Sequence, residues 1–277
     1  SGEHYIVDNK ATTSKGKKSR LKISTSRDGD KLVISVRGRI AESRGEYVDK
    51  VRLTDGALLA GWNLRSALNG FGIELVGSVR PGTITEAGEG APLALLAAHE
   101  SPPMSDICKI ANKPSNNFVS EVIFKTVGAE QFGWPGTFQK GARAIGQYLN
   151  RMGLPSSTFR VVNGSGLTHE NRITPSALAL LLRRIYFDLS VAPDFLNSLA
   201  IGGVDGTIKH RFAGTDAVGL VRAKTGTLSG VSALSGYVGE KDDVLVFSIL
   251  VEGFRGRAKN EVRRAQVMCK AGPQADL

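Results

Sequence analysis

Apolar runs separated by short polar breaks dominate residues 218–254. One run ends at Val221, and two more cover residues 231–238 and 244–251. They are rich in β-branched residues, and a polar stretch over residues 239–243 separates the last two. Runs of this kind, bounded by turn residues, are typical of β-strands. The pattern therefore predicts three consecutive antiparallel strands, with residues 223–227 at the end of the first strand, beside a turn.

The middle of the chain follows the helical period, with apolar residues three and four positions apart. Gly70, Pro114 and Gly153 are stop signals, and Thr174 followed by Pro175 is a start signal. The pattern predicts helices over residues 58–68, 104–111, 118–127, 138–152 and 174–185, a short strand over 73–79, and a C-terminal helix over 259–270 packed on the sheet.

The beginning of the chain alternates with the period of a half-buried sheet. Apolar residues flank Asp28-Gly29, which predicts a β-hairpin over residues 20–37. Cations crowd residues 10–22, where we expect a solvated loop and keep a specific binding role as the alternative. The change from strands to helices predicts a domain boundary near residue 45, with a β-rich unit at 1–45 and the remainder at 46–277. The fold class is α+β.

Length and composition describe a folded globular chain. It has 277 residues, of which 22% are charged and 41% hydrophobic, and no apolar run reaches membrane-spanning length. A net charge of +10 favours a polyanionic neighbour, which could be nucleic acid, anionic lipid or an anionic cell-wall polymer. Cys108 and Cys269 lie in apolar contexts without metal-ligand spacing. We expect two buried thiols, with a disulfide as the alternative.

Residues 223–227, Ala-Lys-Thr-Gly-Thr, form the first candidate site. At a strand end, Lys224 supplies charge, Thr225 and Thr227 supply hydroxyl donors, and Gly226 lets a ligand approach the backbone. Such a group can hold an anion. A nucleotide P-loop is excluded, because alanine precedes the lysine where that motif requires glycine. The alternative is a solvated hairpin end.

The second candidate site is the turn between the helices predicted over 104–111 and 118–127. It contains Ser115 and Asn117, which follow Pro114 in the sequence. Serine and asparagine are also favoured helix N-caps, so plain capping is the alternative. Glycine-punctuated loops follow at residues 163–168 and 202–207.

Taken in order, these motifs resemble those of the class C low-molecular-mass penicillin-binding proteins, of the penicillin-binding protein 4 type. That family comprises D-alanyl-D-alanine carboxypeptidases and endopeptidases, which are serine-type hydrolases. The resemblance runs from about residue 47 to about residue 254. It rests on Lys-Pro-Ser-Asn-Asn-Phe, Val-Asn-Gly-Ser-Gly-Leu-Thr, Gly-Val-Asp-Gly-Thr and Arg-Ala-Lys-Thr-Gly-Thr-Leu-Ser-Gly-Val.

The resemblance implies a fold and a set of roles. The fold would be that of the penicillin-binding proteins and serine β-lactamases, an antiparallel sheet with helices, preceded by the tail of an inserted β-rich domain. Ser115 would pass a proton to the leaving D-alanine, Asn117 would hold the peptide amide, and Lys224 would make the pocket positive. Thr225 and Thr227 would bind the terminal carboxylate beside Gly226, and the Thr227 backbone N–H would be half of the oxyanion hole. The substrate would be a peptidoglycan stem peptide, and β-lactams would be inhibitors.

The family's Ser-x-x-Lys nucleophile motif has no fitting counterpart. Only Ser14 and Ser19 have a lysine three positions later, and both lie in the polar cationic stretch, whereas the mechanism needs a buried helical pair. We therefore expect the nucleophile upstream of this chain, in a longer parent protein. Residues 1–10 lack the apolar core of a signal peptide, so the periplasmic or extracytoplasmic location that the resemblance implies would need a leader outside this sequence. Asn163 replaces the family's usual aspartate.

Two other functions are kept as alternatives. A non-catalytic member of the fold would bind peptidoglycan or a partner without a nucleophile. A nucleic-acid-binding protein would need stacking aromatics among its cations, but aromatic residues make up 6% of the chain. No metal or organic cofactor is expected, because the four histidines are scattered without ligand spacing; they are His4, His99, His169 and His210.

Overall fold

A computed structural model of the chain describes residues 4–29, 31–48, 55–82, 95–240, 243–254 and 267–270. By its contacts the chain forms two compact units, Ser1–Ala97 and Ala98–Leu277. The division falls later than the boundary predicted near residue 45, because helix α1 (Gly56–Gly70) groups with the sheet that precedes it. The assignment of 1–45 and 46–277 to separate domains of a parent protein stays a prediction.

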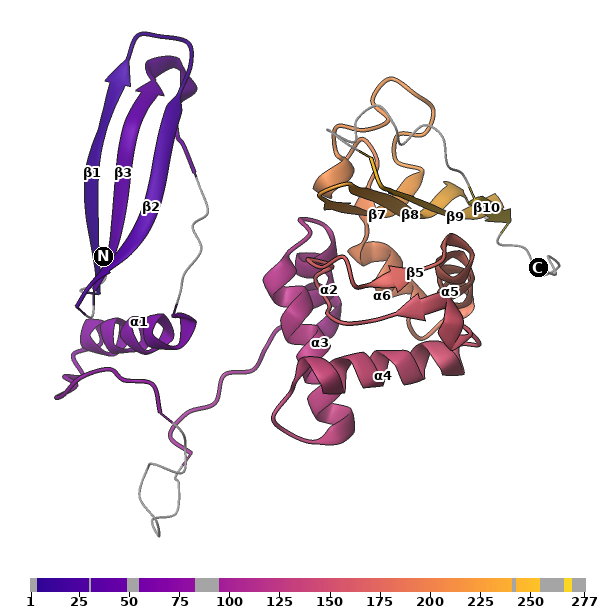
Figure 1. Ribbon diagram of the computed structural model, residues 1–277, viewed down its shortest axis with the longest axis horizontal. Coiled ribbons are helices and arrows are strands. Elements are labelled where there is room, and N and C mark those ends of the chain that lie inside the picture. The colour runs from indigo at the N-terminus through magenta and orange to yellow at the C-terminus, as the bar shows by residue number, and fades with distance from the viewer. Residues whose placement is uncertain are drawn as a thin grey trace. The chain divides into compact units, whose positions relative to one another are not determined.

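The first unit contains a three-stranded sheet of β1 (Tyr5–Ser14), β2 (Arg20–Asp28) and β3 (Lys31–Ala41). The order is β1-β3-β2, so the central strand β3 runs antiparallel to β2 and parallel to β1 (Figure 1). The predicted hairpin is therefore confirmed, and Gly29 at its turn has a positive φ of 57°. The solvated loop expected over residues 10–22 is wrong in part, because this stretch contains the end of β1 and the start of β2.

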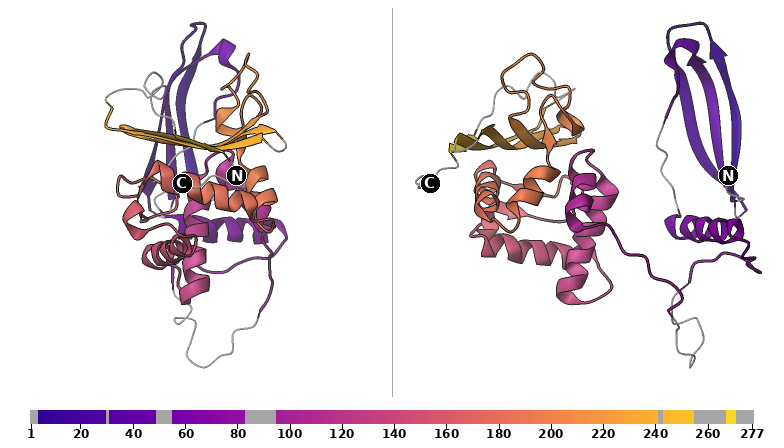
Figure 2. Two further views of the ribbon diagram at one scale, coloured as in Figure 1. Left: turned by 90° about the vertical axis from the view of Figure 1, so that its right-hand side faces the viewer. Right: turned by 180° about the vertical axis from the view of Figure 1, so that it is seen from behind.

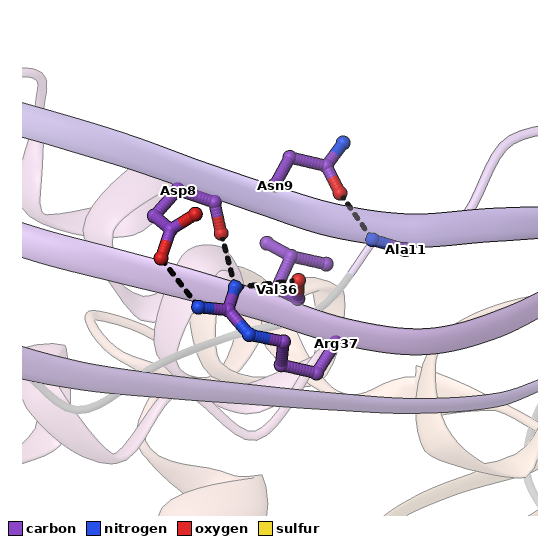
Figure 3. Close-up of polar contacts among 5 residues, drawn as sticks. All are labelled: Asp8, Asn9, Ala11, Val36 and Arg37. Atoms are coloured by element: carbon purple, nitrogen blue, oxygen red, sulfur yellow. Dashed lines mark hydrogen bonds and ion pairs between the residues drawn. The ribbon is translucent and has the colours of Figure 1, made fainter.

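A side-chain bridge links the two parallel strands of this sheet. The Arg37 guanidinium, on β3, donates to the Asp8 carbonyl oxygen on β1 at 2.7 Å and also to the Asp8 carboxylate (Figure 3). The hydrogen bond from Arg37 lowers the pKa of Asp8 below its usual value. On the same strand, the Asn9 side chain accepts from the Ala11 backbone N–H at 3.0 Å.

Helix α1 is tied to the sheet through its N-terminal cap. The Asp55 side chain accepts from the Leu58 N–H at 2.9 Å and forms an ion pair with Arg27 of β2. After α1 the chain turns at Gly72, and residues 73–79 form no strand. The strand predicted there is wrong, because β-branched residues form a strand only where a neighbouring edge accepts their hydrogen bonds.

The second unit contains a five-stranded antiparallel sheet in the order β10-β9-β8-β7-β6. Its strands are β6 (Ala200–Ile201), β7 (Val221–Leu228), β8 (Val231–Glu240), β9 (Asp243–Glu252) and β10 (Val267–Lys270). The three predicted strands correspond to β7, β8 and β9 and are confirmed, except that residues 223–227 lie inside β7, which pairs with β8 as far as Leu228. The helix predicted over 259–270 is wrong at its end, because residues 267–270 pair with β9; residues 259–266 lie outside the described part of the chain.

The four helices predicted over residues 104–185 are present, and a fifth, short helix was not predicted. They are α2 (Met104–Asn112), α3 (Asn117–Phe132), α4 (Phe138–Arg151), α5 (Pro175–Phe187) and the short α6 (Ala192–Ser198), and a two-stranded ribbon of β4 (Phe159–Arg160) and β5 (Arg172–Ile173) joins them. Figure 2 shows the sheet nearly edge-on, with these helices gathered on one side. Among the described residues, no helix combines the length and apolar character needed to cross a membrane.

Each face of the sheet has its own buried core. On the helical side, Leu182 of α5 and Leu199 pack against Tyr237 and Val246 of the sheet. The Tyr237 hydroxyl donates to the Leu182 carbonyl oxygen at 2.7 Å. On the opposite side, the segment between β6 and β7 supplies the fully buried Ile208, which packs on Ala223. The helical-side core rests on β8 and β9, whereas β7 contributes Val221 and Ala223 to the core under the covering segment.

Gly236 provides a test of this strand packing. A Cβ atom at Gly236 would lie 2.1 Å from the Arg222 carbonyl oxygen on β7, so Gly236→Ala should lower the free energy of unfolding by about 1–3 kcal/mol. Gly146, within α4, is the matched control because a Cβ there would meet its nearest atom at 3.9 Å. Gly146→Ala should raise stability by about 0.5–1 kcal/mol. Denaturant titration of both variants checks the two signs, and equal effects would contradict the packing described.

Candidate active site

The turn between α2 and α3 holds Ser115 in an unusual backbone conformation. Ser115 has φ 59°, and the Asn116 N–H donates to the Ala111 carbonyl oxygen at 2.9 Å. The left-handed residue and this bond across six residues are two features of a Schellman motif, in which the left-handed position is usually glycine. Serine in this position carries backbone strain, which surrounding contacts must offset. Strain of this kind is characteristic of functional sites.

Helix capping in this turn is performed by Asn116. Its side chain accepts from the Val119 N–H at 3.2 Å, so it is the N-cap of α3. Asn117 is the first helical residue and is exposed. The capping alternative therefore accounts for Asn116 and leaves the side chains of Ser115 and Asn117 without a capping role.

Lys224 of β7 reaches this turn. Its Nζ donates to Ser115 Oγ at 2.7 Å and to the Thr225 carbonyl oxygen at 2.7 Å. Burial lowers the pKa of Lys224 below its ordinary value. The contact unites the two candidate sites of the sequence, the strand end and the inter-helix turn.

The hydroxyl groups of β7 lie beside this contact. Thr225 Oγ1 donates to Thr207 Oγ1 at 2.9 Å, and Thr227 is exposed. β6 pairs only with Arg222 and Ala223, so beyond residue 223 no described strand pairs with β7 on this side. Residues 224–228 therefore have one strand edge without a β6 partner.

The loop that supplies Thr207 is braced against the α2–α3 turn. The Lys113 ammonium forms an ion pair with Asp205, and the Thr207 N–H donates to the Lys113 carbonyl oxygen at 3.0 Å. Between them, Gly206 has φ 59°, and a Cβ there would lie 2.8 Å from that same carbonyl oxygen. Glycine is thus required for this close approach. The sequence predicted a glycine-punctuated loop here, and these contacts hold that loop in one conformation.

Asn163 closes the loop on the other side of the site. Its Oδ1 accepts from the Gly166 N–H at 3.1 Å and from Asn171 Nδ2 at 2.9 Å. Asn171 in turn accepts from the Val162 N–H at 2.7 Å. Both bonds to Asn163 need only an acceptor, and a carboxylate oxygen would accept them equally. The replacement of the family's aspartate therefore changes the charge of this loop and keeps the acceptor that shapes it.

A cleft of about 1100 Å³ opens between these segments. All of the residues that the sequence singled out line it, from the α2–α3 turn and from β7: Ser115, Asn117, Lys224, Thr225, Gly226 and Thr227. Sequence reasoning named no role for Thr207, which also lines the cleft, or for Lys113 and Asp205. Asp205 and Thr207 belong to the Gly-Val-Asp-Gly-Thr motif quoted above. Their contact with the α2–α3 turn, about ninety positions away in sequence, is visible only in three dimensions.

The two serines with a lysine three positions later lie in the other unit. Ser14 ends β1, and Ser19 precedes β2, where its Oγ accepts from the Ala41 N–H at 2.9 Å. Neither serine is helical. In the part of the chain that the structure describes, no three His, Cys, Asp or Glu side chains cluster as they would around a metal ion. Cys108 is a free, half-buried thiol, and the Cys269 side chain lies outside the described residues.

Comparison with known proteins matches residues 2–272 to the D-Ala-D-Ala carboxypeptidase 3 (S13) family. The chain is 33% identical over 237 residues to the D-alanyl-D-alanine carboxypeptidase of Actinomadura sp. (strain R39), covering 84% of this chain and 43% of that protein. It is 29% identical over 210 residues to the D-alanyl-D-alanine carboxypeptidase DacB of Haemophilus influenzae, covering 74% of this chain and 42% of that protein. The chain thus spans less than half the length of these curated relatives.

The fold is also found in a solved structure. Penicillin binding protein 4 from Haemophilus influenzae, complexed with a β-lactam, matches with a TM-score of 0.71 at 23% identity. The match covers 93% of this chain and 59% of that one. The predicted α+β fold of the penicillin-binding proteins is confirmed.

The Lys113–Asp205 brace makes a prediction about pH. Burial raises the pKa of Asp205, but hydrogen bonds from Lys113 and the Ile201 N–H outweigh it, and the net pKa lies below the ordinary 3.8. The ionised Asp205 therefore contributes stability above pH 4, which is lost as pH falls below the ordinary value toward the lowered one. Asp205→Asn should melt lower than wild type at pH 7 and lose less stability between pH 5 and pH 3. Asp216→Asn, at an exposed carboxylate of the same unit, is the control and should follow the wild-type profile.

Proposed function

The chain belongs to the D-Ala-D-Ala carboxypeptidase 3 (S13) family, and we propose that it forms part of a serine-type D-alanyl-D-alanine carboxypeptidase or endopeptidase. The parent enzyme would act on peptidoglycan stem peptides by acyl transfer. The observation that carries the proposal is the 2.7 Å contact between Lys224 Nζ and Ser115 Oγ in a cleft. This chain would supply proton transfer and substrate binding, and the nucleophile would come from sequence upstream.

The geometry of Ser115 and Lys224 suits proton delivery to a leaving amine. Because Lys224 donates to Ser115 Oγ, the hydroxyl proton of Ser115 is free to point toward another acceptor. When acyl transfer expels D-alanine, Ser115 gives that proton to the amine nitrogen and takes one from Lys224. The lowered pKa of Lys224 favours this step, since a desolvated ammonium gives up its proton more readily.

The substrate would lie along the open edge of β7. An extended peptide can add to residues 224–228 as a further strand, because β6 ends short of them. Lys224 attracts the terminal carboxylate, Thr225 and Thr227 bind it, and Gly226 leaves room for the approach. Thr225 now donates to Thr207, so its hydroxyl would rotate to meet the ligand. Asn117, exposed on the opposite wall, holds the peptide amide, and the Thr227 N–H contributes to the oxyanion hole.

The proposal extends to location and inhibitors. A peptidoglycan hydrolase works outside the cytoplasm, so we place the parent protein in the periplasm or another extracytoplasmic compartment. β-Lactams, which acylate the same nucleophile, would inhibit it. The net charge of +10 suits an anionic wall polymer as the surroundings of the enzyme.

A second candidate is a non-catalytic member of the fold that binds peptidoglycan. It is suggested by the observation, shared with the first candidate, that neither Ser14 nor Ser19 lies on a helix. The upstream coding sequence distinguishes the two candidates, because only the enzyme requires Ser-x-x-Lys at the start of a helix.

Lys224→Ala in the full-length parent protein should slow acylation by penicillin on the order of a hundredfold or more. Loss of its ammonium removes a buried positive charge beside Ser115 and, with it, the proton source for that hydroxyl. Stopped-flow acylation together with thermal melting separates this loss from unfolding. Equal acylation rates for variant and wild type would contradict the assignment.

Ser115→Ala and Asn117→Ala should each slow turnover of a D-Ala-D-Ala peptide, with the thermal midpoint little changed. Neither side chain caps α3, so their loss removes groups of the cleft and no backbone partner. Asn116→Ala is the contrasting variant and should cost about 1 kcal/mol of stability, because it deletes the N-cap. A stability loss of that size for Ser115 or Asn117, with turnover per folded molecule unchanged, would reverse the assignment.

The 277-residue chain by itself should form no covalent adduct with a β-lactam. Positioning and electrostatics remain in its cleft, but an acyl-enzyme needs a nucleophile. Incubation with fluorescent penicillin followed by intact mass measurement checks this. An adduct that Ser14→Ala or Ser19→Ala abolishes would locate the nucleophile in the first unit.

A further inference from the structure

The glycine-rich loop at residues 163–167 is held by a carboxylate from α3. Glu121 Oε2 accepts from the Gly164 N–H at 3.0 Å, and Oε1 accepts from the Ser165 N–H at 3.3 Å and from Ser165 Oγ at 2.5 Å. Two successive backbone N–H groups thus converge on one anion, the arrangement called a nest. A loop of this composition could have bound an anion of the substrate, but its amides already bind Glu121.

The other two backbone N–H groups of the loop bind acceptors within the loop. Ser165 Oγ accepts from the Leu167 N–H at 3.2 Å, and Asn163 Oδ1 accepts from the Gly166 N–H at 3.1 Å. The hydroxyl of Ser165 therefore links Glu121 to the far end of the loop. All four backbone N–H groups from Gly164 to Leu167 have side-chain acceptors, so the conformation of the loop depends on these few side chains.

Steric contact holds the same loop against α3. A Cβ atom at Gly164 would lie 2.5 Å from the Ser120 carbonyl oxygen and 2.7 Å from Phe124 Cβ. The loop backbone thus rests directly on the helix that carries Glu121. The helix and the loop form one continuous wall, joined by packing and by charge-assisted hydrogen bonds.

Both parts of this wall face the cleft. Asn117 lies four residues before Glu121, one turn earlier on α3, and lines the cleft, as do Ser165 and Leu167. Leu167 is 59% exposed. Glu121 itself is not among the lining residues, and both its carboxylate oxygens are occupied by the loop.

We propose that Glu121 is a positioning residue that locks the 163–167 loop to α3 and thereby fixes the cleft wall facing β7. The inference rests on the proposed function, since its effect on rate requires that acyl transfer occurs in this cleft. Glu121 touches no reacting atom. Its loss lets the loop move away from α3, which widens the cleft and misplaces the substrate relative to Ser115 and Lys224.

Glu121→Gln is the informative variant, because it keeps the size of the side chain and replaces one acceptor oxygen with an NH₂ donor. At least one of the three loop donors then faces a donor. Glu130→Gln is the matched control, since Glu130 is exposed near the C-terminal end of the same helix and outside the cleft lining. Both variants remove one negative charge from α3.

Two measurements on the full-length parent protein test the proposal. We expect Glu121→Gln to slow acylation by penicillin per folded molecule by about tenfold, the equivalent of one charge-assisted hydrogen bond, while Glu130→Gln reacts like wild type. Amide hydrogen exchange should accelerate at residues 163–167 in Glu121→Gln alone.

The possible outcomes separate this inference from the proposed function. Acylation per folded molecule equal to wild type in Glu121→Gln overturns the positioning role, even if the melting temperature falls. Unchanged amide hydrogen exchange at residues 163–167 in Glu121→Gln would show that Glu121 does not hold the loop against α3. If the wild-type parent protein is not acylated at all, the proposed function fails, and the exchange measurement still decides for or against the lock.

Discussion

The site depends on the contact between a strand lysine and a serine in an inter-helix turn. Lys224 reaches Ser115 because Val221 and Ala223 anchor β7 in the core and because the turn presents serine in a left-handed conformation. Neither segment forms the contact alone: β7 supplies the ammonium of Lys224, and the turn supplies the hydroxyl of Ser115. Their meeting places an ammonium of lowered pKa beside a hydroxyl whose proton is free.

Polar side chains that bind backbone groups hold the walls around this contact. Asp205 pairs with Lys113 at one end of the cleft, and Asn171 binds the loop at Asn163. Burial of apolar area is non-directional, whereas hydrogen bonds to named N–H and C=O groups fix a loop in one conformation. The sheet and helices thus supply stability through their cores, and the loops obtain their shape from individual polar bonds.

The sequence predicted the parts of this arrangement that have a local period. Strands β7 to β9, the hairpin of β2 and β3, and five helices followed from apolar spacing and from turn residues. The sequence does not predict strand β1, which pairs in parallel with the distant β3. It predicts a helix in place of β10, because four residues are too few to show whether apolar positions alternate. Residues 73–79 have the composition of a β-strand, but no neighbouring strand pairs with them in the described part of the chain.

Within the site, the motifs identified the residues that line the cleft, but their partners were not predictable. Lys113, Thr207 and Glu121 act through contacts with residues distant in sequence. Such contacts produce no regular spacing of residue types that a single sequence would reveal. The roles given to Ser115, Asn117 and β7 stay predictions. Their proximity, in contrast, is an observation.

The left-handed serine has a consequence for protein engineering. Glycine is the residue that a Schellman turn prefers, so any search for stabilising substitutions would rank Ser115→Gly favourably. The same exchange would delete the hydroxyl that meets Lys224. Thermostabilised variants of this chain selected for folding alone should therefore be expected to drift away from serine at this position. Libraries meant to preserve the cleft need position 115 held constant, and local strain of this kind is a practical guide to which positions to protect.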